Sequence, residues 1–310
     1  MAATSILIVA HERKVQRIVL RVLSSTGYPI ELVDDLASAR ARIDAGPPDL
    51  VVVDGAVARS REVSPFFHDV TARSATACLL LLGAAQLAQL PTMLAQAAIT
   101  NLLVHPMPVL GEELTVTAQK LLRGDLFGAE KYLLWGTALE AATLTHAHDR
   151  GALVDELADQ LRARGLSGRV AAMGMLIADE LLSNAVHNAP VDDHGHHYRA
   201  DLPRDAALAL DGRHQVGLRW GCDGRYLAIE VADEFGSLAR DTALRALVPS
   251  QVVDAGGGAG MGIALAYRAC DHLVFNLAPG RRTEVIALID VRFPPGERVP
   301  ASSYNVFVER

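Results

Sequence analysis

Long apolar runs, paired cysteines and an excess of basic residues are all missing from this sequence of 310 residues. No segment reaches the roughly 18 uninterrupted apolar residues that a membrane-spanning helix needs. The N-terminal stretch MAATSILIVAHERK has an apolar run of only five residues, which is too short for a signal peptide. The cysteines are odd in number and far apart at positions 78, 222 and 270, which favours reduced thiols. We therefore expect a cytoplasmic protein without a membrane span.

The charge balance limits the class of partner. The formal net charge is −7 and the sequence pI is about 5.9. Nucleic-acid binding depends on clustered Lys and Arg that neutralise phosphates, so we expect no nucleic-acid partner. Proteins and small molecules remain as candidates.

The first 122 residues alternate between short apolar runs and segments with helical periodicity. ILIV at 6–9 is followed by a helical pattern over 15–28, and four further strand and helix pairs end near residue 124. This alternation predicts a doubly wound, flavodoxin-like domain with a five-stranded parallel sheet over residues 1–122.

The second half of the chain has a different pattern. We expect a packed connector over 123–139, helices over about 138–165 and around residue 184, strands over 217–233, and two more strands before residue 292. Mixed helices and antiparallel strands predict an α+β sandwich over 140–292. The remaining residues, 293–310, form a tail in which NVFVE favours an added edge strand.

The N-terminal pattern resembles the receiver domain of response regulators. Asp54 ends the predicted third strand, where that family is phosphorylated. The family's acidic pair is replaced by Ala10 and His11, its hydroxyl residue by Gly83 and its lysine by His105. Phosphorylation needs Mg²⁺ and the groups that hold it. The resemblance therefore implies a degenerate receiver used for docking or dimerisation, with phosphorylation of Asp54 as the alternative.

The stretch DELLSNAVHNAP, residues 179–190, has an unusual helix pattern. Glu180, Asn184, His187 and Asn188 fall on one face, and apolar residues occupy the other. A solvated face is the ordinary interpretation, but an interior Asn costs roughly 0.6 kcal/mol relative to Ala. Two such residues on one stripe favour a ligand-binding role.

Two further motifs carry groups suited to a nucleotide. AGGGAGMGIALAY at 255–267 places small residues before a helix, where free backbone N–H groups bind phosphates. IEVADEFG ends an apolar strand at Asp233, whose carboxylate accepts a hydrogen bond from an exocyclic amine. The absence of GK[ST] excludes a P-loop, and a flexible turn and an acidic turn are the ordinary alternatives.

The order and spacing of these motifs, followed by GRRT at 280–283, resemble the GHKL (Bergerat) ATP-binding fold of gyrase, Hsp90, MutL and histidine kinases. The resemblance implies a site for ATP and Mg²⁺, in which Asn184 holds the metal and Asp233 selects adenine. The other residues that it assigns to nucleotide binding are His187, Asn188, Gly236, Gly258, Gly260, Met261, Gly262 and Thr283. The family's DxGxG box is altered, because Phe235 and Ser237 replace its two glycines.

Within that family, the compact ExxxN form is similar to the anti-sigma-factor serine kinases. Glu180 then stands where these proteins keep a general base. The expected partner is a protein: a sigma-factor-like protein, its antagonist, another signalling protein or a second copy of the chain.

Three alternatives stay open. A histidine kinase would need His146 or His148 as phosphoacceptor on a dimerising helix. The run DDHGHH at 192–197 is a candidate metal loop, with a solvated loop as the ordinary interpretation. Finally, a degenerate receiver joined to a degenerate nucleotide domain could form a non-catalytic interaction scaffold.

Overall fold

The computed structural model describes residues 4–57, 60–90, 99–105, 111–204, 206–248, 260–292 and 302–309. The chain divides into two compact units. The first contains Met1–Leu126 and Ser303–Phe307, and the second contains Phe127–Ser302 and Val308–Arg310. No helix in the described ranges is both long enough and apolar enough to cross a membrane.

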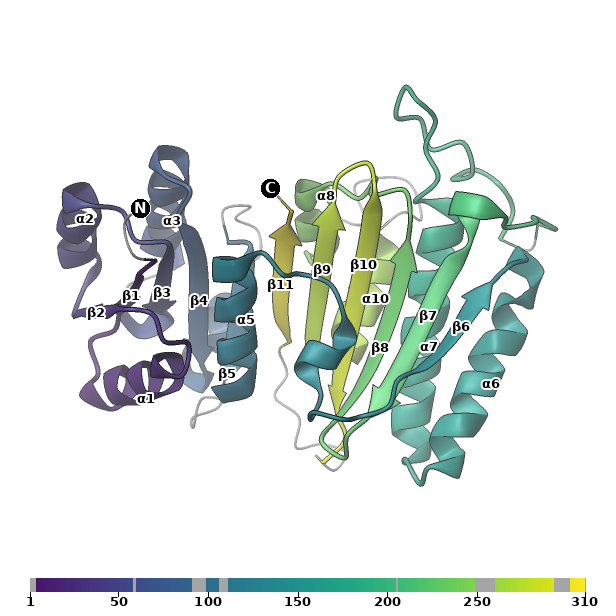
Figure 1. Cartoon of the computed structure of the whole chain (residues 1–310), viewed down its shortest axis with the longest axis horizontal. Coiled ribbons are helices and arrows are strands. Elements are labelled where there is room, and N and C mark those ends of the chain that lie inside the picture. The colour runs from purple at the N-terminus through teal and green to yellow at the C-terminus, as the bar shows by residue number, and fades with distance from the viewer. Residues whose placement is uncertain are drawn as a thin grey trace. The chain divides into compact units, whose positions relative to one another are not determined.

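The first unit contains a parallel sheet with the strand order β2-β1-β3-β4-β5 (Figure 1). Helices α1 and α5 pack on one face, and α2 contacts α3 where the Arg40 guanidinium lies 5.6 Å from the Phe66 ring. The predicted doubly wound five-stranded sheet is therefore confirmed. Its elements are β1 (Ile6–Val9), α1 (Arg13–Ser24), β2 (Ile30–Val33), α2 (Leu36–Ala45), β3 (Leu50–Asp54), η1 (Gly55–Val57), α3 (Ser60–Arg73), β4 (Ala77–Gly83), η2 (Ala84–Gln89), β5 (Asn101–His105) and α5 (Gly111–Arg123).

The C-terminal tail contributes a strand to this first unit. β11 (Ser303–Val308) pairs antiparallel with β5, with Asn305 opposite Asn101. The amide of Asn305 donates to Asn101 Oδ1 at 3.1 Å, and the Tyr304 hydroxyl donates to the carbonyl of Ile99 at 2.9 Å. The sequence placed this strand in a separate tail, whereas residues 303–307 belong to the first unit and pair with its parallel sheet.

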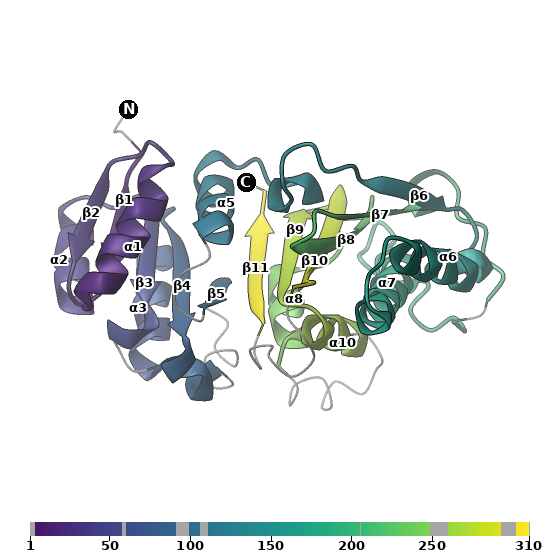
Figure 2. The ribbon, with the colours of Figure 1, turned by 90° about the horizontal axis from the view of Figure 1, so that it is seen from below.

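The second unit is a two-layer structure in which one face of an antiparallel sheet carries the helices (Figures 1 and 2). The strand order within the unit is β9-β10-β8-β7-β6. Helices α7 and α10 contact the sheet, and α6 packs on α7. The elements are η3 (Ala129–Tyr132), β6 (Glu140–Leu144), η4 (Ala147–Asp149), α6 (Arg150–Ala163), α7 (Gly168–His187), η5 (Gly212–His214), β7 (Val216–Cys222), β8 (Tyr226–Asp233), α8 (Arg240–Ala246), α10 (Met261–Ala269), β9 (His272–Ala278) and β10 (Arg282–Asp290).

The first part of the second unit differs from the sequence prediction. The helix expected from about residue 138 begins only at Arg150, because residues 140–144 form β6 along the edge of β7. The segment expected as a connector packs on this unit through two buried carboxylates. Glu284 accepts from the backbone N–H of Gly128 at 2.8 Å, and Glu230 accepts from that of Ala129 at 2.9 Å.

Candidate functional site

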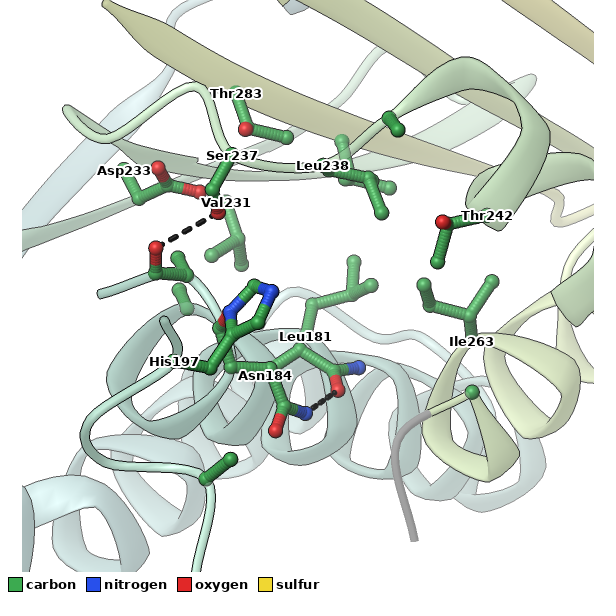
Figure 3. A pocket seen from close by; sticks show the side chains of 17 residues that line it. Leu181, Asn184, His197, Val231, Asp233, Ser237, Leu238, Thr242, Ile263 and Thr283 are labelled. Carbon is green, nitrogen blue, oxygen red and sulfur yellow. Dashed lines mark hydrogen bonds between the residues drawn. The ribbon is translucent and has the colours of Figure 1, made fainter. Parts of the chain in front are cut away.

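A cavity of about 210 Å³ lies in the second unit, between α7, the sheet and the start of α10 (Figure 3). It is walled mainly by aliphatic side chains, with a few polar groups among them. The polar residues on its wall are Asn184, Asn188, His197, Asp233, Ser237, Thr242 and Thr283. Four of these were predicted from motifs that are far apart in the sequence: Asn184, Asn188, Asp233 and Thr283.

Helix α7 supplies the amide wall of the pocket. The Ser167 hydroxyl caps its first turn by accepting from the Val170 N–H at 3.3 Å, and apolar residues such as Leu181 and Ala185 cover its inner face. Asn188 Nδ2 donates to Asn184 Oδ1 at 2.7 Å, and Asn184 Nδ2 is buried without a partner among the described residues. The nitrogen end of this amide therefore faces Gly262 of α10 without a hydrogen-bond partner in the described chain.

His187 is not on this wall, although the sequence pattern placed it there. Its side chain is 0% exposed and does not line the cavity. Successive helix residues are roughly 100° apart, so position 187 lies on the opposite side of Asn184 from Asn188. Burial lowers the pKa of His187, and the nearby Arg204 lowers it further. The backbone of Arg199 opposes this shift, but neither ring nitrogen makes a hydrogen bond of acceptable geometry within the described chain.

Glu180 and Asn184 lie against the first turn of α10. A methyl group built on Gly262 would lie 2.5 Å from Glu180 Oε2 and 3.0 Å from Asn184 Nδ2. A side chain at position 262 would therefore have to move the Glu180 carboxylate. Burial raises the pKa of Glu180, the neighbouring Asp179 raises it further, and Arg150 and Arg204 oppose the rise. Glu180 does not line the cavity itself but stands beside Asn184 at its edge.

Asp233 ends β8 and forms the opposite wall of the pocket, across from Asn184 in Figure 3. Its side chain is 6% exposed, and Oδ1 accepts from the N–H groups of Phe235 at 2.9 Å and Gly236 at 3.2 Å. Burial raises the pKa of Asp233 to about 6. The nearby Thr283 hydroxyl lowers this pKa. Like the nitrogen of Asn184, the Thr283 hydroxyl oxygen makes no well-aligned hydrogen bond with any described residue.

The turn after Asp233 explains the altered DxGxG motif. Gly236 has φ +60°, and a side chain there would collide with the backbone of the β9–β10 hairpin, 2.2 Å from the Ala278 carbonyl oxygen. This glycine is therefore needed by the turn, and it does not line the cavity. Phe235 is buried, with the Arg213 guanidinium 4.2 Å from its ring. The Ser237 hydroxyl donates to the Ala189 carbonyl at 2.7 Å and ties the turn to the end of α7.

The glycine motif is described only in part. Gly260 has φ +109°, precedes α10 and lines the cavity, whereas Met261 is exposed and lies outside its lining. The first N–H groups of a helix have no intrahelical partner and favour anions. Gly258 lies outside the described residues.

The segment after α7 was not predicted to belong to the site. His197 lines the cavity, and its Nδ1 lies 2.6 Å from the Asn188 carbonyl oxygen. A carbonyl only accepts, so Nδ1 carries the proton and Nε2 remains free. The run at 192–197 drew attention only as a possible metal loop, but it contains no group of three ligand side chains that could hold a metal ion. Asp192 Oδ1 instead accepts from the backbone N–H groups of His194 and His196, each at 2.9 Å.

The histidine-kinase alternative lacks its structural requirement. His146 and His148 lie at the end of β6 and in the 3₁₀ turn η4, both exposed, and not on a dimerising helix. Both instead lie within ion-pair distance of Asp149, at 3.7 and 3.3 Å.

In the first unit, Asp54 stands at the end of β3 as predicted. It is 7% exposed, and Oδ1 accepts from the Ala56 N–H at 3.1 Å, while Oδ2 has no partner in the described ranges. Burial raises its pKa, and the charge of Glu12 adds to this effect. Ala10 is fully buried and His11 is exposed, so no acidic pair stands beside Asp54 at these positions.

Comparisons with known proteins are limited to part of the chain. No protein-family model matches it, and no curated protein gives a significant match. Among solved structures, it is similar to the signal receiver domain of a putative LuxO repressor protein from Vibrio parahaemolyticus, with 15% identity over 39% of this chain and 92% of that chain and a TM-score of 0.34. It is similar to a response regulator from Thermotoga maritima, with 16% identity over 39% and 98% of the two chains and a TM-score of 0.34. The chain is also similar to the chemotaxis response regulator CheY4 of Vibrio cholerae, with 22% identity over 39% of this chain and 100% of that chain and a TM-score of 0.33.

Proposed function

We propose that this chain is a bacterial signal-transduction protein whose second unit binds ATP with Mg²⁺ and, in the manner of anti-sigma-factor kinases, phosphorylates or sequesters a protein partner. The observation that carries the proposal is that Asn184, Asp233 and Thr283, from three separate motifs, line one cavity of the described structure. Gly260 adds the start of a helix to the same wall. The receiver-like unit serves as a docking or regulatory module.

The side of the cavity formed by Asp233 favours adenine over guanine. Asp233 Oδ1 already accepts two backbone N–H groups, which leaves the other carboxylate oxygen for a ligand. One oxygen suits the single exocyclic amine of adenine, whereas guanine presents two adjacent donors. Aliphatic residues such as Val231 and Val285 line the same cavity and suit a flat apolar ring.

The side of the cavity formed by Asn184 and Asn188 fits a magnesium ion that is bound mainly by phosphates and water. Mg²⁺ usually takes only one or two protein oxygens in such sites. The oxygen and nitrogen of an amide are assigned from hydrogen bonding, so Asn184 and Asn188 can both be turned over with their mutual bond kept. Asn184 would then present its oxygen beside Gly262 and Glu180. A bound Mg²⁺ would neutralise charge on the phosphates.

Glu180 is the residue that would act on the partner. Its raised pKa makes the carboxylate a better proton acceptor than an ordinary Glu. We infer that it takes the proton of a partner serine hydroxyl as the serine oxygen attacks the terminal phosphoryl group, while ADP leaves. ATP supplies the phosphoryl group in this reaction.

Calorimetry with ATP, with and without Mg²⁺, tests the proposal directly. We expect saturable ATP binding that weakens when Mg²⁺ is removed, and weaker binding of GTP than of ATP. Incubation with labelled ATP and a lysate then shows whether label reaches another protein. Absence of ATP binding at millimolar concentrations would overturn the proposal.

A second candidate function is a scaffold that does not use ATP. The cavity volume of about 210 Å³ is below the roughly 300–1,000 Å³ of ordinary ligand sites, which favours this candidate. A ligand that binds only the folded state raises the melting temperature with its concentration. A melting temperature that does not change with ATP and Mg²⁺ would support the scaffold.

A further inference from the structure

We propose that the α7–β7 segment, residues 189–204, is the phosphate-recognition element of the pocket, with Arg204 supplying the positive charge and His197 a second contact. This inference rests on the proposed nucleotide site and assigns residues to it that lie outside all of its sequence motifs.

The need for such a residue follows from the composition of the pocket wall. No Lys or Arg is among the described residues that line the cavity, and Asp233 adds a negative charge to it. Glu180 adds a second carboxylate beside Asn184. A nucleoside triphosphate brings several further negative charges, and phosphate sites offset them with metal ions and Arg or Lys. A cation must therefore come from a neighbouring segment.

Arg204 is the basic residue best placed to act. Its Nη1 lies 3.5 Å from the carbonyl oxygen of Ser183, the residue before Asn184 on α7, on the side of the helix that carries His187. The charge of Arg204 also lowers the pKa of both Glu180 and His187, so it faces the same end of the helix. Among the described residues, the Arg204 guanidinium forms no salt bridge, unlike that of Arg150.

The neighbouring basic residue, Arg150, is already neutralised. Its Nε lies 2.8 Å from Asp179 Oδ1, and its side chain is partly buried. Arg204 is exposed and on a flexible stem, so its guanidinium can move to a phosphate without breaking a salt bridge in the described structure. The two arginines near Glu180 therefore differ in their availability to a ligand.

His197 extends the same segment into the cavity. Its Nδ1 is held by the Asn188 carbonyl, which fixes the ring and leaves Nε2 toward the ligand space. A neutral Nε2 accepts a hydrogen bond, and a protonated one donates to a phosphate oxygen. The segment thus places one fixed imidazole in the cavity wall and one exposed guanidinium outside it, beside α7.

The test compares the affinities of the full-length protein for ATP and AMP. We expect Arg204→Ala to weaken ATP binding about tenfold or more and to change AMP binding by less than about twofold, because the lost contacts are made to the outer phosphates. Arg204→Lys should recover part of the ATP affinity, and His197→Ala should show a smaller selective loss. Arg162→Ala is the matched control, because that exposed arginine pairs with Asp159 on α6.

Each outcome decides between the two proposals. If the wild type binds neither nucleotide, the nucleotide site and this inference are both overturned. If the wild type binds ATP but Arg204→Ala binds ATP and AMP as the wild type does, only this inference fails. Equal weakening of ATP and AMP would mean that Arg204 supports the fold of the segment, which also overturns the inference.

Discussion

Asp54 and Asp233 are two aspartates that each end a buried strand, one in each unit, yet they stand in very different surroundings. Both side chains are almost fully buried, and burial raises the pKa of both. Asp54 has Ala10 and an exposed His11 at the positions where a metal-binding pair would stand. Asp233 lines a cavity whose other walls carry Asn184 and Thr283.

The two aspartates therefore differ in their surroundings and not in their position at the end of a strand. The backbone satisfies one carboxylate oxygen in both cases, through Ala56 for Asp54 and through Phe235 and Gly236 for Asp233. The remaining oxygen acts only with groups that other elements bring to it. Variants in both units therefore test what each set of surroundings does.

The largest effect is expected from Glu180→Ala. Loss of a positioned proton acceptor lowers turnover by roughly a hundredfold or more, while ATP affinity stays near that of the wild type. Transfer of labelled phosphate to a partner or to water measures the turnover, and calorimetry measures the ATP affinity. Glu156→Ala, at an exposed position on α6, is the control. Unchanged turnover would assign the base to another residue.

Asn184→Ala should act on binding instead. Removal of the amide that faces Gly262 is expected to weaken Mg²⁺-dependent ATP binding by about a hundredfold. Calorimetry in the presence and absence of Mg²⁺ measures the loss, with Ser183→Ala on the adjacent helix position as control. Wild-type affinity in Asn184→Ala would count against the whole pocket assignment.

Gly262→Ala tests the contact between α7 and α10. The added methyl group would lie 2.5 Å from Glu180 Oε2 and 3.0 Å from Asn184 Nδ2, so it crowds the amide assigned to binding, and we expect about tenfold weaker ATP binding and a lower melting temperature. Gly151 is also the second residue of a helix, but a methyl group there meets nothing within 4 Å. Gly151→Ala should therefore stabilise the protein by about 0.5–1 kcal/mol. Equal effects of the two substitutions would contradict the close approach.

The first unit could be predicted further from the sequence than the second. Five repeats of an apolar run and a helical segment leave few topologies, and the strand order follows from them. The tail strand could be recognised, but its partner could not, because the pairing of Asn305 with Asn101 joins residues far apart in the chain. The strand β6 was missed because EAATL has little of the alternation that marks a strand.

The candidate site could be predicted where a motif fixes its own geometry. Asn184, Asn188, Asp233 and Thr283 meet in one cavity, as their motifs implied. The sequence pattern could not show that His197 lines the cavity and His187 does not. His187 is only about 60° around α7 from Asn184, and this small rotation takes its side chain off the cavity wall. His197 lies in an irregular loop, whose position is known only from the folded structure. Gly236 is required by a backbone collision that no local pattern reveals.

Asp233→Asn should abolish ATP binding and make the folded protein more stable at alkaline pH. The folded pKa of about 6 lies above the ordinary 3.8, so the contribution of this group to stability is present below about pH 4 and is lost as the pH rises through 6. We expect the Asn variant to be about 1–3 kcal/mol more stable than the wild type at pH 8, with the difference vanishing near pH 4. Its ATP affinity should be lost. Urea unfolding at both pH values measures this, and a less stable variant at pH 8 would contradict the raised pKa of this buried carboxylate.

The smallest effect is expected at Asp54, and it separates the two aspartates most directly. Incubation with Mg²⁺ and acetyl phosphate should give no phosphorylated protein in intact-mass measurements, because no acidic pair at positions 10 and 11 holds the metal beside Asp54. Since burial raises the pKa of Asp54, Asp54→Asn should modestly stabilise the protein above neutral pH, whereas Asp44→Asn, at an exposed position, should not. A phosphorylated product that disappears in Asp54→Asn would contradict this expectation and show that other residues hold the metal beside Asp54.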